Sequence, residues 1–183
     1  MKKNVKIVAS LIMAALLMNS CGTTEKSMSK EKNAVVASVP TEISVTANPE
    51  FITIKEAISL FENPDDAPTI AKKYGYKLTN NYEIYRLDKF SKLYYKNCRL
   101  AKILTGNQYE DYPKPLRKGV SSYVAFKDGA IIIGVFNQAA YDNLVQQVKA
   151  AGFVLDMPGN EEIYTNGKRT IACYEGAKTV RVQ

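Results

Sequence analysis

The fold is decided most clearly by residues 120–136, which read VSSYVAFKDGAIIIGVF. Two largely apolar runs flank Lys127-Asp128-Gly129, and a short turn containing Asp-Gly between such runs is typical of a β-hairpin. The second run, residues 130–136, is almost wholly apolar, as expected of a largely buried strand. We therefore predict two strands, 120–126 and 130–136, joined by a tight turn.

Downstream of this hairpin the apolar residues change to a helical period. Asn137 is a favourable N-cap residue, and Ala151-Gly152 marks the end of the predicted helix. The apolar positions between them are Tyr141, Leu144, Val145 and Val148. Residues 163–164 and 170–174 are then predicted to pair around an Asn166-Gly167 turn, and residues 179–182 to form a last edge strand.

Upstream, two short helices are predicted before any strand. Thr53 and Glu56 have the spacing of a capping box, so a helix begins there and ends near Asn63-Pro64. A second helix is predicted over residues 66–74, with Pro68 in its first turn and Gly75 at its end.

Between these helices and the hairpin, residues 82–100 alternate aromatic and charged side chains. This pattern predicts two antiparallel strands with Asp88-Lys89 as their turn. Residues 108–119 contain Pro113 and Pro115 and follow no period, so we interpret them as a connection.

Together these elements predict an α+β fold, with short helices packed on an antiparallel sheet in a single domain over residues 51–183. Residues 51–107 and 120–183 look alike, which raises the possibility of two tandem repeats, each a helix followed by a strand meander. A helix ending before Gly75 precedes Cys98 in one, and a helix ending at Gly152 precedes Cys173 in the other. Chance recurrence of a common helix, glycine, strand order is an equally good explanation.

The N-terminus has the pattern of a secretory signal over residues 1–20. Lys2, Lys3 and Lys6 precede an apolar run, residues 7–18, that is shorter than the roughly 20 residues needed to span a bilayer. The sequence LMNSCG, residues 17–22, resembles the lipobox of bacterial lipoproteins. The alternative is an ordinary signal peptide in which Cys21 has no role.

The lipobox resemblance implies that lipid such as palmitate is attached to Cys21 and that cleavage makes Cys21 the first mature residue. Several acyl chains would anchor the protein almost permanently. Residues 21–50 would then form the lipidated cysteine and a flexible tether. The acidic run that serves as a surface-export signal in some lipoproteins is missing after Cys21, so we expect an outer-membrane location facing the periplasm.

Composition excludes several classes of activity. The chain has no histidine, which removes Ser-His-Asp and Cys-His catalysis and histidine-ligated zinc. Loss of the signal lowers the formal net charge from +7 to +4, and the remaining basic residues are interspersed with acidic ones, so nucleic-acid binding is not expected. We predict no metal site and no cofactor.

Two cysteines remain once Cys21 is assigned to lipid. Cys98 and Cys173 form an even pair in a chain exported to a compartment that permits disulfides. They are predicted either to form one disulfide or to be two buried free thiols that behave as small apolar residues.

Catalytic candidates are few. The carboxylate pairs Asp65-Asp66 and Glu161-Glu162 invite comparison with glycoside hydrolysis, yet their settings favour a helix N-terminus and a loop. Ser121-Ser122 could be imagined with Lys118 or Lys127 as a dyad, but both lysines are expected to be solvated. We therefore predict no catalytic residue.

Tyrosine is abundant, and tyrosine and arginine are enriched at binding hot spots. The best candidate for a recognition surface is the set Tyr109, Tyr112, Lys114 and Arg117. The competing interpretation is that such rings pack on the sheet.

The order of elements, a helix followed by an antiparallel meander and repeated, resembles β-lactamase-inhibitor-like proteins and small lipoproteins that assist outer-membrane assembly. This resemblance implies a non-enzymatic module that binds an envelope protein or ligand. The alternative is a carboxylate-dependent enzyme or binder acting on cell-wall or glycan material.

Overall fold

The computed structural model describes residues 44–183. The predicted signal peptide, Cys21 and most of the predicted tether therefore lie outside the described residues. Ordered contacts begin earlier than the predicted domain start at Phe51. The amide nitrogen of Asn143 donates to the backbone oxygen of Thr46 at 2.9 Å, and its oxygen accepts from the backbone N–H of Asn48 at 3.1 Å.

The described residues form three α-helices, α1 (Ile54–Glu62), α2 (Ala67–Tyr74) and α3 (Gln138–Ala150), and a 3₁₀ turn, η1 (Pro64–Asp66). The predicted capping box is confirmed, because Thr53 and Glu56 each bond the other's backbone N–H. Helix α2 starts one residue later than predicted and ends at Tyr74, before Gly75, whose φ of 73° lies in the left-handed region that favours glycine. Asn137 caps α3 through Ala140 N–H, as predicted.

The strands form one large mixed sheet, so the fold is α+β and mostly sheet. The order across it is β4-β5-β1-β2-β7-β8-β12-β11-β10-β9, and all pairs except β1 with β5 are antiparallel. A further pair, β3 (Cys98–Arg99) and β6 (Lys114–Pro115), stands apart. The ten strands are β1 (Lys77–Ile84), β2 (Asp88–Lys96), β4 (Ile103–Thr105), β5 (Gln108–Tyr109), β7 (Ser122–Lys127), β8 (Ala130–Val135), β9 (Val154–Met157), β10 (Glu161–Thr165), β11 (Thr170–Tyr174) and β12 (Thr179–Val182).

The hairpin of residues 120–136 is confirmed as β7 and β8, and it lies in the middle of the sheet. Two local predictions were wrong. The turn after β1 falls at residues 85–87 and leaves Asp88 in β2. Residues 179–182 are no edge strand: β12 pairs with both β8 and β11, because fully buried Val180 and Val182 belong to the core.

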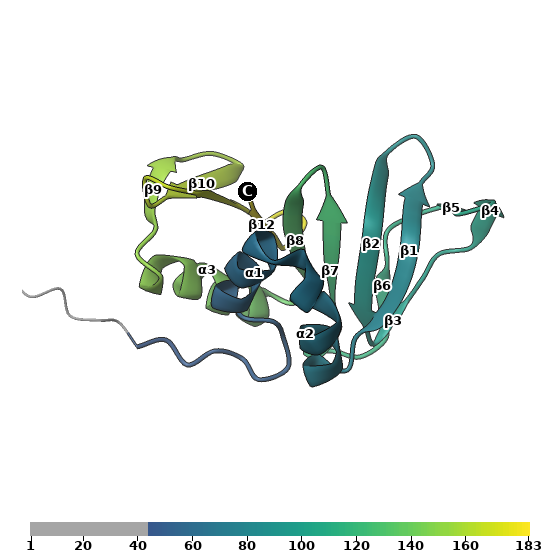
Figure 1. The fold of residues 1–183 in the computed structure, drawn as a ribbon, viewed down its shortest axis with the longest axis horizontal. Helices are drawn as coiled ribbons and strands as arrows, with labels where there is room; N and C mark the ends of the chain where they lie inside the picture. Colours follow the sequence, from purple (N-terminus) through teal and green to yellow (C-terminus); the bar gives the residue numbers. More distant parts are fainter. Residues whose placement is uncertain (1–43) are drawn as a thin grey trace, which may run out of the picture. The chain divides into compact units, whose positions relative to one another are not determined.

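The three helices cover one face of the sheet (Figure 1). The main core joins apolar residues of all three helices to one face of the strands. One row of this face crosses five strands and ends at a glutamate: Val124, Ile133, Val180, Cys173 and Glu162.

A second core lies on the opposite face and covers only part of it. The segment 97–121, of which residues 108–119 were predicted as a connection, folds over β1, β2 and β7. Tyr109 stacks on fully buried Tyr82 with 3.8 Å between ring centroids, and the Tyr82 hydroxyl donates to the Asp111 carbonyl at 2.8 Å. Within the described residues, no side chain of β9 to β12 belongs to this second core.

Candidate functional site

The predicted recognition surface is mostly structural. Tyr109 is buried against Tyr82, and the Tyr112 hydroxyl donates to the Asp88 carboxylate at 2.5 Å. Only Lys114 and Arg117 remain exposed. The interpretation of the tyrosines as packing residues therefore holds, and the four residues do not form one exposed tyrosine surface.

The two carboxylate pairs are not brought together as catalytic groups. Asp65 and Asp66 are exposed in η1. Glu161 and Glu162 are neighbours in β10 and so point to opposite faces of the sheet. Glu161 pairs with Arg181 at 3.1 Å, whereas Glu162 lies on the helix face and accepts a hydrogen bond from Tyr164 at 2.7 Å.

The imagined serine–lysine dyad is also not formed. Ser122 is buried and its hydroxyl lies 2.8 Å from that of Tyr76. Ser121 lies 2.6 Å from the carbonyl of Asn97, and Lys127 pairs with Asp88. Each hydroxyl is thus committed to a structural hydrogen bond away from any lysine ammonium.

Both cysteines are buried free thiols, which is the second of the two predicted states. Cys98 lies against Ser122 at the start of β7, and Cys173 is in β11, so three strand spacings or roughly 14 Å separate them. A disulfide needs Cα atoms within about 7 Å. Burial raises the pKa of Cys98 to about 11 and that of Cys173 to about 12, which disfavours a reactive thiolate.

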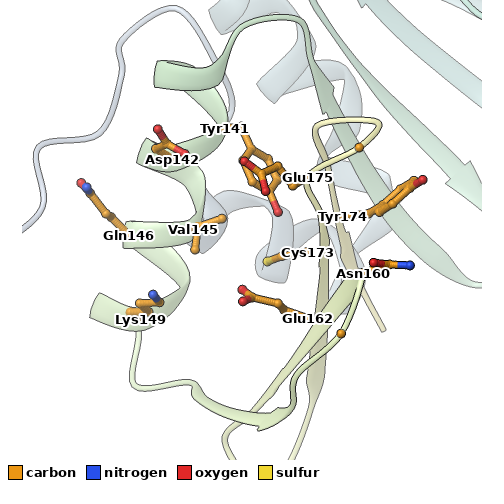
Figure 2. Close-up of a pocket in the computed structure, with 12 residues that line it drawn as sticks. Tyr141, Asp142, Val145, Gln146, Lys149, Asn160, Glu162, Cys173, Tyr174 and Glu175 are labelled. Atoms are coloured by element: carbon orange, nitrogen blue, oxygen red, sulfur yellow. The ribbon is translucent and has the colours of Figure 1, made fainter.

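A groove of about 740 Å³ lies between α3 and strands β10 and β11. Figure 2 shows Val145 on the helix facing Glu162 and Cys173 on the strands, with Asp142 and Lys149 on the same helix. Beside the groove, the helix face of β10 is covered at Tyr164, which is buried in the main core and whose ring centroid lies 5.7 Å from the Lys149 ammonium.

Charge in this groove is mostly negative. Asp142, Glu162 and Glu175 line it together with one basic residue, Lys149, and none of the four forms an ion pair within residues 44–183. The Gln138 amide joins two of these carboxylates, donating to Asp142 at 2.9 Å and to Glu175 at 2.8 Å. The groove could therefore hold a polar or cationic group, but it contains no group activated as a nucleophile.

The other candidate is the part of the opposite sheet face that the segment 97–121 leaves uncovered. The register places one row of side chains across this face, starting in the second core and ending at the edge: Leu93, Ala125, Ile132, Arg181, Ala172, Ile163 and Met157. Met157 at the end of this row is 60% exposed. Tyr174 and Glu161 lie on the same face in the neighbouring row.

Among residues 44–183, strand β9 lies at the end of the sheet and pairs with β10 alone (Figure 1). Its outer edge therefore presents unpaired backbone N–H and C=O groups. Three of its four side chains are large, apolar and exposed, namely Val154, Leu155 and Met157. Edge strands are commonly blunted by lysine or proline, and β9 has one charge, Asp156, and is followed by Pro158.

Arg181 and Glu161 add a polar feature to the uncovered face. Their ion pair is partly exposed, and Arg181 Nε is buried without a hydrogen-bond partner within the described residues. An arginine fixed among apolar side chains is typical of binding surfaces.

No group of three or more potential metal ligands is found among residues 44–183, and no helix there is long and apolar enough to cross a membrane. Comparison with known protein families, with curated proteins and with solved structures finds no match for the chain.

Sequence reasoning missed β9 as a strand. Its four residues follow directly on a helix stop and a buried Phe153, and a run of four residues is too short to show a period. The signal that could have found it is the apolar pair Val154-Leu155 placed just after Gly152.

Proposed function

We propose that this chain is a lipid-anchored protein of the cell envelope, held through Cys21 to the periplasmic face of the outer membrane, whose domain binds another envelope protein without catalysis. The anchor rests on the signal pattern and the lipobox resemblance of residues 17–22. The binding role rests on one observation, the uncovered sheet face that ends in the apolar edge strand β9.

An edge strand of this kind favours an extended protein segment as its partner. A partner strand would satisfy the free N–H and C=O groups of β9, while its side chains would contact Met157 and Ile163. The apolar residues supply affinity and the Arg181–Glu161 pair supplies selectivity. A small molecule could not satisfy a row of backbone groups in this way.

The test compares two matched substitutions at equally exposed apolar residues. Met157 is 60% exposed in β9, and Leu116 is 62% exposed in the segment 97–121. After crosslinking in cells, the wild-type chain and Leu116→Lys should copurify with the same partner, and Met157→Lys should lose it. Loss in both variants, or in neither, would contradict binding through β9.

The tandem-repeat interpretation also belongs to this proposal. It is supported by the order α2, Gly75, Tyr76, β1 in one half and α3, Gly152, Phe153, β9 in the other. Both glycines have positive φ, and both aromatic residues are buried. The predicted halves, residues 51–107 and 120–183, would then meet where β2 pairs with β7.

A second candidate function is favoured by the acidic groove. A binder of cell-wall or glycan material would use Asp142, Glu162 and Glu175, whose carboxylates have no ion-pair partner in the described part of the chain. Sedimentation with purified peptidoglycan tests this alternative. Binding that is lost in Glu162→Gln would favour it, whereas sedimentation equal to that of a non-binding control protein would exclude it.

A further inference from the structure

A separate pocket of about 480 Å³ lies where the end of α2 meets the start of β1 and the end of β2. Leu116, Arg117 and Val120 form part of its lining. Its size lies within the range of small-ligand sites. Three basic side chains and one acidic side chain line it: Lys77, Lys96, Arg117 and Glu50.

Lys96 is the most buried of the three basic side chains that line this pocket. Only 17% of its side chain is exposed, and its ammonium donates to the Glu50 carboxylate at 2.7 Å and to the Glu50 carbonyl at 3.0 Å. A charge so far removed from water requires partners of this kind. Glu50 comes from the segment before α1 and its side chain is 46% exposed, so it is a counter-ion that solvent can reach.

The other two cations are not neutralised. Lys77 and Arg117 are exposed and form no ion pair within residues 44–183. The hydrogen bond and charge of Lys96, and then the charge of Arg117, hold the pKa of Glu50 below its usual value. Lys96 and Arg117 therefore both act on the Glu50 carboxylate. With Glu50 in place, the charged side chains that line the pocket have an excess of two positive charges.

We propose that this pocket binds a phosphate group through Lys77, Lys96 and Arg117, and that Glu50 occupies the anion position beside Lys96 in the absence of ligand. The planar guanidinium of Arg117 matches two phosphate oxygens, and the lysines act as point charges. Inorganic phosphate brings up to two negative charges and a phosphodiester headgroup brings one, and both offer more acceptor oxygens to the three cations than a carboxylate does. The phosphate can be free in solution or part of a phospholipid headgroup.

The test measures thermal unfolding of the purified full chain in detergent, with phosphate titrated against chloride at constant ionic strength. A ligand that binds only the folded state raises Tm as its concentration rises. The Tm increase should persist in Glu50→Gln and start at lower phosphate. In Arg117→Gln and Lys77→Gln the affinity should fall about tenfold or more, since each variant removes a charge-assisted hydrogen bond.

Lys114→Gln is the matched control, because Lys114 lies in the same segment as Arg117 but pairs with Asp111 outside the pocket. It should respond to phosphate as the wild-type chain does. Glycerophosphoglycerol, the deacylated headgroup of phosphatidylglycerol, distinguishes the two sources: a response to it alone indicates a lipid, and a response to inorganic phosphate alone indicates a free ligand.

Phosphate also stabilises folded proteins by exclusion from their surfaces, and that effect does not depend on Arg117 or Lys77. An equal Tm increase in the wild-type chain and both pocket variants would therefore overturn the proposal. So would the lack of any response to both ligands in the wild-type chain and in Glu50→Gln.

Discussion

The two ends of the large sheet differ in how many of their faces are covered. Strands β2 and β7 are covered by helices on one face and by the segment 97–121 on the other, whereas β1 packs on that segment through Tyr82 and Ile84 and leaves Leu78 48% exposed on the helix face. Strands β9 to β12 are covered on the helix face alone, and there only in part. The doubly covered strands are packed on both faces, and the end with one open face has surface left for a partner.

Replacement of a tyrosine by alanine at each end should give the largest difference in the free energy of unfolding. Tyr82→Ala removes a fully buried ring that stacks on Tyr109 and should cost about 3–5 kcal/mol of unfolding free energy. Tyr174→Ala removes a ring that is 42% exposed on the open face and should cost no more than about 0.5 kcal/mol. Urea unfolding followed by circular dichroism measures both, and equal costs would remove the distinction between the two ends.

The second largest effect on stability is expected at alkaline pH, through buried tyrosines at the doubly covered end. Burial raises the pKa of Tyr76 and of Tyr82 to about 12, above the ordinary value of 10.0. Their contribution to stability is complete below pH 10.0 and is lost as the pH rises to about 12, because the unfolded chain releases these protons more readily.

Tyr82→Phe sharpens this test, since it removes the titrating hydroxyl and keeps the ring. The decline in unfolding free energy between pH 10 and 12 should be shallower in Tyr82→Phe than in the wild-type chain. Tyr85→Phe, at a ring that is 44% exposed, is the control and should keep the wild-type slope. Identical slopes in all three proteins would show that Tyr82 does not contribute.

Helix capping should give a smaller effect. Thr53→Ala removes one side of the capping box and should cost about 1 kcal/mol, as should Asn137→Ala at the start of α3. Both helices pack on the same face of the sheet. A cost at Asn137 far below that at Thr53, measured by thermal unfolding, would indicate that the end around α3 is held less firmly.

The smallest effect on stability is expected from charges placed on exposed apolar residues. Met157→Lys and Leu116→Lys should each change the unfolding free energy by no more than about 0.5 kcal/mol. Matched Tm values would establish that loss of a partner in Met157→Lys reflects its surface and not its folding. A marked destabilisation by Met157→Lys would instead indicate that β9 is part of the stable core.

The sequence predicted local structure better than topology. The hairpin of β7 and β8, the Thr53 capping box and the stop at Gly75 all depend on residues close together in the chain. The central place of β12 depends on pairing with β8, some 45 residues away, and no local pattern encodes it. The tyrosines were ambiguous for the same reason, because only the folding of residues 97–121 over the sheet decides that Tyr109 is buried.

The candidate sites could not be predicted from the sequence either, because they too depend on how the chain folds. Lys77, Lys96 and Arg117 are separated along the chain and meet only in the fold. Glu161 and Glu162 looked like a pair because they are adjacent, yet adjacency in a strand places them on opposite faces.

The central claim, that the uncovered end of the sheet binds a protein through β9, is tested most directly by photo-crosslinking in cells. A photoreactive residue placed at Met157 should give one discrete adduct of higher mass, and the same residue at the exposed Lys72 of α2 should give none. An adduct of the same mass at both positions, or no adduct at Met157, would contradict the claim.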